Sequence, residues 1–360
     1  MAEIRIIGNG PVALTCALLL ARHWPEPDRI LLDAANDPSP GLAQRPLALS
    51  VGSHRLLERV AAAPTPAAGI RTVEVALQGR YGRVRMPASD LHADVLGYVV
   101  RYQNLLATLE SALAQSGVQR VPAGFQERSA VVTIQAGGDP GPQAATRTFG
   151  QAALTAEARV KGLAPGTALE RFTREGPLAL LPLPEPSRWA LVWCAPEALT
   201  RERLTMEPER RLHALNVALG RNLSVSAIDD CAVIPLVRRT REPLVQLGAG
   251  GVQVWIGNAA QTLHPVAGQG LNLGLRDADQ LTQALLHWRI QGEGDAEQAL
   301  LRYTGLRRRD RSITVALTDG LAEVFTWPLL APAQSVVMTL LDRSPLLRRG
   351  VARRFALGSA

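Results

Sequence analysis

The stretch "GNAAQTLHPVAGQGLNLGLRDADQL" (residues 257–281) decides the fold, because it joins patterns that a plain loop does not combine. It follows the apolar run "VQVWI" (252–256), which is typical of a buried strand, and it begins rich in glycine, asparagine and glutamine. From Leu271 to Trp288 apolar residues recur every three or four positions, which predicts an amphipathic helix packed on a core. A strand, a glycine-rich turn and a helix in this order indicate a backbone that lies against a flat ligand with polar edges.

The N-terminal sequence also places an apolar strand before a glycine-rich turn and a helix, and it predicts a parallel βαβ unit. "EIRII" (3–7) reads as a short buried strand, and "GNGPVA" (8–13) reads as a turn that leads into an apolar helix. "RILLDA" (29–34) reads as the second strand. Strand, glycine turn, helix and strand together indicate a nucleotide-binding unit. The alternative reading is a tight turn in some other α/β protein.

Four residues of this unit have the chemistry of a dinucleotide site. Gly8 permits a sharp turn, Gly10 lets the backbone approach a diphosphate, and Ala13 fills the place of the third glycine. The helix N-terminus presents free N–H groups and the positive end of its dipole to phosphates. Asp33 ends the second strand, where a carboxylate accepts hydrogen bonds from ribose hydroxyls.

The middle of the chain is patterned differently. Residues 151–247 alternate short strands and turns, which predicts a mixed or antiparallel sheet with one helix around "ERRLHALNVALG" (209–220). Residues 118–150 are poorly patterned, and the chain after 281 reads as helical. This order predicts an α/β fold in which a nucleotide-binding domain is interrupted by a sheet domain and followed by C-terminal helices. The predicted boundaries are 1–68, 97–147 and 248–290 for the first domain, 69–96 and 148–247 for the second, and 291–360 for the helical region.

Charge and cysteine content narrow the class of protein. The net charge is +7, and Lys161 is the only lysine, so the simplest reading is a compositional bias towards arginine; an anion-binding surface is the alternative. The basic runs "LRRRDR" (306–311) and "LLRRGVARRF" (346–355) read as solvated helix faces. Because no aromatic residues interleave with the arginines, we expect no nucleic-acid partner.

Three scattered cysteines without a CxxC pair predict neither a disulfide framework nor a metal site, which fits a cytoplasmic protein. The apolar stretch 327–341 is too short and too interrupted to span a bilayer, so we expect a soluble protein that at most attaches peripherally to the inner face of the membrane.

The residues at 257–278 closely resemble the second flavin-binding motif of the class A FAD-dependent aromatic monooxygenases, which have the 4-hydroxybenzoate hydroxylase fold. Within this class the chain is most similar to the ubiquinone-biosynthesis hydroxylases, and "ALERFTREGPLALLPL" (168–183) with "LVWCAPE" (191–197) resembles the 2-polyprenyl-6-methoxyphenol hydroxylases. "RPLALSVGS" (45–53) and "LTDGLAEVF" (317–325) match as well. The resemblance implies a Rossmann-like FAD-binding domain interrupted by a mixed β-sheet substrate domain.

The resemblance also implies a set of cofactor-binding residues. Asn258 stands where many members have an aspartate on the ribityl chain, and Pro265 would lie near the isoalloxazine face. His264 reads as a loop histidine bonded to backbone, which we favour over a catalytic role. The complete set implied to contact FAD is Gly8, Gly10, Ala13, Asp33, Arg45, Arg101, Gly257, Asn258, Pro265, Gly268, Gln269, Gly270, Leu271 and Asn272, with Arg101 the weaker of the two arginines.

The implied chemistry belongs to the cofactor. NAD(P)H would reduce FAD, O₂ would form a C4a-hydroperoxide, and the distal oxygen would attack a polyprenylated phenol. The implied partners are this phenol, O₂ and a quinone-biosynthesis protein assembly. Because the C-terminal segment 327–355 combines apolar and basic residues, we also expect a peripheral membrane contact through its helices, with ordinary packing of these helices on the domain as the alternative. No side-chain nucleophile or metal is required.

One family motif is missing. An Asp-Gly pair followed by serine and arginine is expected near "VVTIQAGGDPGPQAATRTFGQAAL" (131–154), where "AGGD" (136–139) is either a degenerate remnant or the sign of a deleted strand. The first alternative function is therefore a flavin-poor or non-catalytic relative that acts as an interaction subunit. The second, an NAD-dependent dehydrogenase, leaves 257–281 unexplained.

Overall fold

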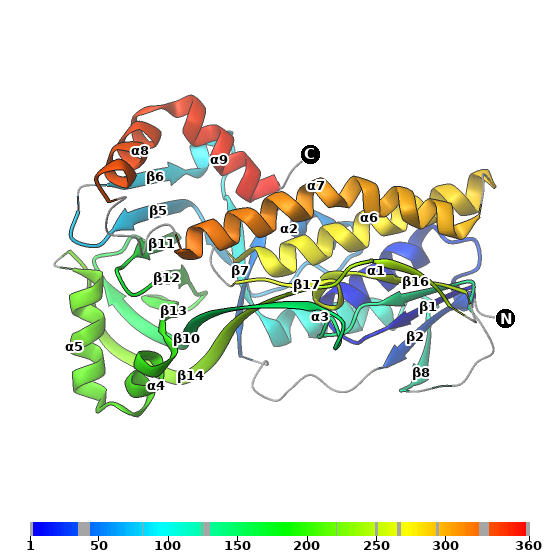
Figure 1. Ribbon diagram of the computed structural model, residues 1–360, viewed down its shortest axis with the longest axis horizontal. Coiled ribbons are helices and arrows are strands. Elements are labelled where there is room, and N and C mark those ends of the chain that lie inside the picture. Colours follow the sequence, from blue (N-terminus) through cyan, green and yellow to red (C-terminus); the bar gives the residue numbers. More distant parts are fainter. Residues whose placement is uncertain are drawn as a thin grey trace.

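The computed structural model describes residues 3–34, 44–80, 82–123, 125, 130–220, 222–248, 251–264, 268–292, 295–323 and 331–357. Its helices and strands form two large sheets and one small sheet, with long helices running along one side (Figure 1). The predicted α/β class is confirmed.

The first sheet is the predicted nucleotide-binding sheet, in the order β15–β16–β9–β1–β2–β8. The strands from β16 to β8 pair in parallel, and β15 adds an antiparallel edge. The bounds are β1 (Ile4–Ile7), β2 (Ile30–Ala34), β8 (Gln119–Pro122), β9 (Val132–Gln135), β15 (Val245–Gly248) and β16 (Gly251–Trp255). The βαβ unit and the return of the late strand to this sheet are confirmed.

The helices that line the core of this sheet include α1 (Pro11–His23), α3 (Tyr102–Leu113) and α6 (Gln269–Gln291). Leu275, Ala278, Leu281 and Leu285 of α6 are fully buried in one cluster with the apolar residues of α1 and β1. The three- and four-residue spacing of these side chains places them on one stripe of α6, as the sequence predicts.

Strand β9 corrects the reading of residues 118–150 as poorly patterned. Its four residues pair in parallel with β1 on one side and with β16 on the other, so β9 is central. Such a short buried strand shows no periodicity, and only its two neighbours identify it.

The second sheet has eight strands in the order β17–β14–β10–β13–β12–β11–β5–β6 and is mixed, because β11 and β5 pair in parallel. One helix was expected beside it, but there are two, α4 (Glu197–Thr205) and α5 (Pro208–Leu219). The sequence "EALTRERLT" of α4 has too few apolar residues to show a helical stripe. The strands are β5 (Thr72–Leu77), β6 (Arg83–Pro87), β10 (Ala145–Lys161), β11 (Thr167–Phe172), β12 (Pro177–Pro182), β13 (Arg188–Pro196), β14 (Ser224–Thr240) and β17 (Gln261–Thr262).

The small third sheet joins the other two. It contains β3 (Pro46–Ser50), β7 (Gly97–Arg101) and β4 (Ala68–Ile70). Ser50 then starts α2 (Val51–Arg59), because its hydroxyl accepts the Ser53 N–H at 3.1 Å and caps the helix.

The C-terminal part is helical, as predicted. Helix α7 (Ala296–Glu323) runs beside α6, and α8 (Ala331–Arg343) and α9 (Pro345–Leu357) lie over β6 at the end of the second sheet (Figure 1). No helix in the described ranges is both long enough and apolar enough to cross a bilayer. The described residues also form the short 3-10 turns η1 (Pro27–Arg29), η3 (Ala88–Leu91) and η4 (Gly257–Ala259).

Candidate functional site

The carboxyl ends of four parallel strands bring distant segments to one edge of the first sheet. Ile7 of β1 stands in register with Asp33 of β2 and with Gln135 of β9, which in turn stands beside Trp255 of β16. The turns that follow β1 and β16 therefore lie along the same edge. Ligands of parallel sheets bind at this edge.

Gly8 is required by the backbone of the first turn. Its φ is +141°, and a Cβ there would lie 2.6 Å from the carbonyl oxygen of Ala136. Its N–H donates to the Asp33 carbonyl at 3.1 Å, which ties the turn to the end of β2. A side chain at this position would push the turn off the sheet.

The start of α1 is open towards the edge. A Cβ on Gly10 would meet only the Tyr102 hydroxyl, at 4.0 Å. No side chain caps α1, so the first N–H groups of the helix lack an intrahelical partner. The Ala13 side chain is fully buried and packs α1 on the core, as the third position of the glycine turn requires.

Asp33 is buried, and its two carboxylate oxygens have different surroundings. Arg5 on the neighbouring strand donates to Oδ2, whereas Oδ1 is buried without a hydrogen-bond partner in the described part of the chain. An orphaned buried oxygen is costly unless a ligand satisfies it. A ribose hydroxyl would do so.

The second turn packs directly on α1. A Cβ on Gly257 would lie 3.0 Å from Val12 of α1, and one on Gly274 of α6 would lie 2.8 Å from the same side chain. Glycine at both positions lets β16, α1 and α6 approach closely. Asn258 follows and is exposed, so its amide is accessible to a ligand.

The N-terminus of α6 is also uncapped. Gly268 has a φ of 58° and precedes the helix without a side-chain cap. A Cβ on Gly270 would meet nothing within 4 Å, whereas Gln269 is buried and Leu271 is partly buried against the core. Free N–H groups at this end favour a negative charge. Pro265 lies outside the described residues.

Asn272 holds this helix end in place. Its Oδ1 accepts the Ser50 N–H at 2.8 Å, and its Nδ2 donates to the carbonyls of Ala48 at 3.0 Å and Gly268 at 2.9 Å. The side chain therefore fixes α6 against β3 and α2, while the backbone stays available to a ligand.

The two candidate arginines have different surroundings. Arg101 forms ion pairs with Glu157 and Glu185 of the second sheet, the latter at 3.2 Å, and Glu157 most of all raises its pKa. Arg45 is exposed and has no ion pair among the described residues. Its carbonyl accepts the Tyr102 N–H at 2.9 Å, so it lies next to the open start of α1. Arg45 is thus the better placed of the two for an anionic ligand.

His264 is a buried neutral ring. It is 1% exposed, its ring lies edge-on to Phe149 with centroids 5.1 Å apart, and burial lowers its pKa to about 4. A ring with this pKa is uncharged at neutral pH. The packing supports the structural reading of His264.

The "AGGD" segment directly follows β9, so the central position of the sheet is filled. Asp139, however, pairs with Arg239 and accepts the Gly141 N–H at 2.6 Å. Its carboxylate is engaged by the second sheet and its loop, so it does not replace the missing Asp-Gly pair.

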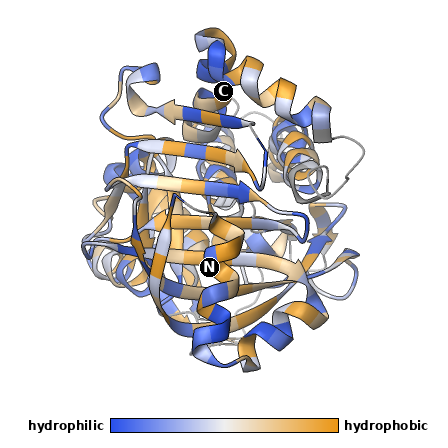
Figure 2. Cartoon of the chain, turned by 90° about the vertical axis from the view of Figure 1, so that its left-hand side faces the viewer, coloured by the Kyte–Doolittle hydropathy of each residue, from blue (hydrophilic) through white to orange (hydrophobic). Residues whose placement is uncertain are grey.

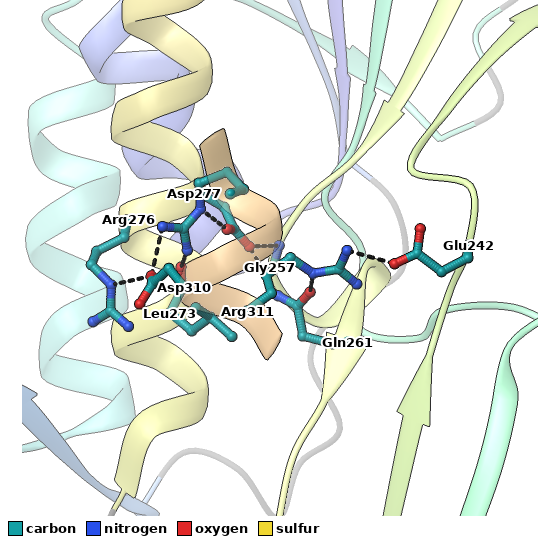
Figure 3. A network of polar contacts seen from close by, with 9 residues as sticks. Glu242, Gly257, Gln261, Leu273, Arg276, Asp277, Asp310 and Arg311 are labelled. Atoms are coloured by element: carbon teal, nitrogen blue, oxygen red, sulfur yellow. Dashed lines mark hydrogen bonds and ion pairs between the residues drawn. The ribbon is translucent and has the colours of Figure 1, made fainter. Parts of the chain in front are cut away.

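A buried polar network that the sequence did not predict supports the second turn (Figure 3). Asp277 of α6 accepts the Gly257 N–H at 3.1 Å and the Gln261 amide at 2.9 Å, and its other oxygen accepts from Arg307 of α7 at 2.8 Å. Arg311 of α7 donates to Gln261 at 2.6 Å. The network anchors the turn to two helices.

The reading of "LRRRDR" as a solvated face is therefore wrong for half of its residues. Arg307, Asp310 and Arg311 are 0%, 5% and 8% exposed, whereas Arg308 and Arg309 are exposed. Burial alone lowers the pKa of Arg307, but the carboxylates of Asp277 and Asp310 raise it overall. The spacing of Tyr303, Arg307 and Asp310 by three and four residues was the available signal of a buried helical stripe.

Glu170 of the second sheet is a partly buried acid. On β11, Leu169 packs towards α5, so its neighbours Ala168 and Glu170 point to the opposite face, where Ala168 packs on Val99 of β7. The Glu170 carboxyl has no hydrogen bond or ion pair among the described residues, and burial raises its pKa to about 7. A titratable group thus lies on the sheet face that is turned towards the small third sheet.

Comparison with known proteins agrees with this geometry. The model of the FAD binding domain family matches residues 131–316. Ubiquinone hydroxylase UbiL of Rhodospirillum rubrum is 31% identical over 221 residues, which are 59% of this chain and 49% of that protein. The 3-demethoxyubiquinol 3-hydroxylase of Escherichia coli is 33% identical over 193 residues, 52% of this chain and 48% of that protein. The chain spans about half the length of these curated relatives.

Solved structures share the fold. The p-nitrophenol 4-monooxygenase PnpA of Pseudomonas putida superposes with a TM-score of 0.77 at 16% identity, covering 100% of this chain and 98% of that one. PqsL of Pseudomonas aeruginosa superposes with a TM-score of 0.74 at 15% identity, covering 94% and 99%. The predicted combination of a Rossmann-like domain and an interrupting sheet domain is confirmed.

Proposed function

The chain belongs to the FAD-binding domain family, and from this premise we propose that it is an FAD-dependent monooxygenase that hydroxylates the ring of a polyprenylated phenol in ubiquinone biosynthesis. The observation that carries the proposal is the meeting of the Gly8 turn, Asp33 and the Gly257 turn at one sheet edge. This assignment replaces the NAD-dependent dehydrogenase alternative, because the family match includes residues 257–281.

The described residues fit FAD. The free Oδ1 of Asp33 would accept an adenosine ribose hydroxyl, and the uncapped start of α1 beside Gly10 would hold the diphosphate. Asn258 is exposed where the ribityl chain would pass, and the N-terminus of α6 would stabilise negative charge on the pyrimidine edge of the flavin. Arg45 would provide the cationic contact with bound FAD.

Bound FAD would supply the transfer of electrons from NAD(P)H to O₂ and of one oxygen atom to the ring. The chain would bind and orient the ring between the first domain and the face of the second sheet that carries Glu170, and it would exclude water there. Glu157 is paired with Arg101, so Glu170 would be the acid on this face that takes the proton of a phenol, which would make the ring more electron-rich.

A second function is favoured by one specific observation. Asp139 is engaged with Arg239, so the chain lacks the middle motif expected of the family. A relative that binds flavin poorly would act as an interaction subunit in a quinone-biosynthesis assembly. The two candidates differ in whether the purified protein carries FAD.

The test is a visible absorption spectrum of the protein purified without added cofactor and again after addition of FAD. Near-stoichiometric flavin, followed by phenol-stimulated NAD(P)H oxidation, is the result expected of the monooxygenase. A folded protein that stays colourless in both conditions overturns that proposal and favours the interaction subunit.

We also propose that the protein works at the inner face of the membrane. A polyprenyl tail partitions into the bilayer, so the ring has to be taken up at the lipid surface. We also propose the division into domains. The FAD-binding domain would contain residues 1–68, 97–147 and 248–290, and the substrate domain would contain residues 69–96 and 148–247.

A further inference from the structure

The C-terminal helices leave one apolar face uncovered. The side of these helices that faces the second sheet is packed, because Met338 of α8 and Ala352 of α9 join a buried cluster with Val84 and Met86 of β6. Their outer side is exposed. Five of the thirteen exposed large apolar residues in the described part of the chain fall within twelve positions: Val336 (58% exposed), Val337 (62%), Leu340 (58%), Leu346 (80%) and Leu347 (58%). In Figure 2 the helices at the top of the view, beside the C-terminus, carry orange segments.

Basic side chains border this face. A hollow of about 470 Å³ between β6 and α8 is lined by Arg83, Arg85, Thr339, Asp342 and Arg343. Three arginines face two carboxylates here: Asp342 accepts the backbone N–H of Arg85 at 2.9 Å, and Glu74 of β5, behind the hollow's own lining, pairs with Arg83 at 2.8 Å and with Arg85 at 3.7 Å. Arg343 has no ion pair among the described residues. The hollow therefore keeps an excess of positive charge.

The hollow and the apolar face adjoin each other on α8. Val336, Leu340 and Arg343 follow one another at spacings of four and three residues, so they form one stripe along the helix. Arg343 ends that stripe and also lines the hollow. An anion held in the hollow would lie beside the apolar residues.

We propose that the outer face of α8 and the start of α9 docks on an anionic lipid bilayer, with Val336, Val337 and Leu340 in the acyl region and a lipid phosphate in the Arg83–Arg85–Arg343 hollow. Apolar side chains beside arginines match the two layers of a bilayer interface. Guanidinium groups bind phosphate oxygens through paired hydrogen bonds.

Charge favours lipid over a second copy of the chain as the occupant. In a symmetric dimer each patch would face its own copy, and the arginines of both copies would be brought together. Like charges in contact oppose association. The net charge of +7 adds a long-range attraction to an anionic surface.

The purpose of this docking rests on the proposed function, since a polyprenylated substrate would be taken from the same bilayer. The docking itself depends only on the surface and needs no bound flavin.

The experiment is cosedimentation of the full chain with vesicles of phosphatidylcholine alone, and of phosphatidylcholine with about one-third phosphatidylglycerol. We expect at least about tenfold tighter binding to the anionic vesicles, lost at high salt. Val337→Asp with Leu340→Asp should abolish binding, because two carboxylates would face the acyl chains. Arg343→Ala should weaken binding about fivefold, since removal of one arginine near an anionic surface lowers the affinity by about this factor.

The matched control substitutions lie on α5, which packs on β14 of the second sheet. Val217 is 61% exposed and Arg210 is exposed, so Val217→Asp introduces one aspartate at an exposed valine and Arg210→Ala removes one exposed arginine, both away from the patch. Both should bind like the parent chain. Thermal melts confirm that each variant is folded, which the exposure of the changed side chains leads us to expect.

Three results would overturn the proposal: no preference of the parent chain for anionic vesicles, equal losses in the patch and control variants, or a parent dimer that Val337→Asp and Leu340→Asp convert to a monomer in sedimentation velocity. Flavin absorbance is recorded on the same samples. A colourless protein that still binds anionic vesicles leaves the docking intact and refutes the proposed monooxygenase.

Discussion

At the scale of single residues, Gly8 and Asp33 have features that a ligand-binding site would explain. One holds a backbone angle of +141° against the Ala136 carbonyl, and the other leaves a buried oxygen without a partner. Glycine adopts this angle at little cost and keeps the turn close to the sheet, whereas the orphaned Asp33 oxygen costs free energy until a ligand satisfies it. FAD would account for them together.

Gly8→Ala is expected to destabilise the fold by about 1–3 kcal/mol, because a Cβ would meet a carbonyl oxygen at 2.6 Å in a left-handed conformation. FAD occupancy should fall as the turn shifts. Gly137→Ala is the control, since a Cβ there meets nothing within 4 Å. Urea unfolding and the visible spectrum measure the two effects. Equal destabilisation by both substitutions would disprove the steric account of Gly8.

Glu170→Gln is expected to change how stability depends on pH. Burial raises the pKa of the folded carboxyl from 4.5 to about 7, so the folded state holds the proton more tightly than the unfolded state. The parent chain therefore loses stability as the pH rises from 4.5 to about 7. The glutamine variant avoids this loss and should be more stable at pH 8 by on the order of 2 kcal/mol.

Denaturant unfolding at several pH values checks this, with Glu202→Gln on the exposed surface of α4 as the control. The same pH profile in both variants would refute it. Should Glu170 also take the phenol proton, kcat/KM of the glutamine variant would fall about 100-fold.

At the scale of elements, a buried ion cluster joins the helices to the cofactor turn. Asp277 of α6 binds Arg307 of α7 and the backbone of Gly257 at once, so the position of η4 depends on both helices. A sequence pattern shows which residues share a helical face. It does not show which face another helix covers, and this is why the prediction of a solvated face for "LRRRDR" (306–311) is wrong for its buried half.

Asp277→Asn is expected to cost about 3 kcal/mol, because it leaves the fully buried Arg307 charge with a weaker partner. Asp279→Asn is the matched control on the same helix. Its partner Arg59 is 55% exposed, and the loss there should stay below about 1 kcal/mol. Urea unfolding of both variants gives the comparison, and similar losses would show that Arg307 finds other compensation.

At the scale of the whole molecule, the proposed FAD site is assembled from the first 33 residues, the β9 region and residues 257–272. A ligand that bridges them stabilises the folded state as a unit. FAD at 100 times its Kd should contribute about 2.7 kcal/mol, which for a chain of this length raises Tm by about 3–4 °C.

Differential scanning calorimetry with and without FAD tests this, and FMN, which lacks the adenosine moiety, is the matched ligand. A smaller shift with FMN is expected, because it cannot reach Asp33. Equal shifts of Tm with the two flavins would show that the adenosine half of the proposed site does not bind.

The sequence by itself determined the parts whose geometry is local: the βαβ unit with Gly8 and Asp33, the glycine turn after β16, and the core stripe of α6. A strand, a turn and a helical stripe are encoded in neighbouring residues, so their patterns are readable before folding. Only the tertiary structure decided the central place of β9, the Arg101 ion pairs, the Asn272 clamp and the burial of Arg307. Each of these depends on partners far away in the chain, because removal of a polar group from water is set by what packs against it and not by its neighbours in sequence.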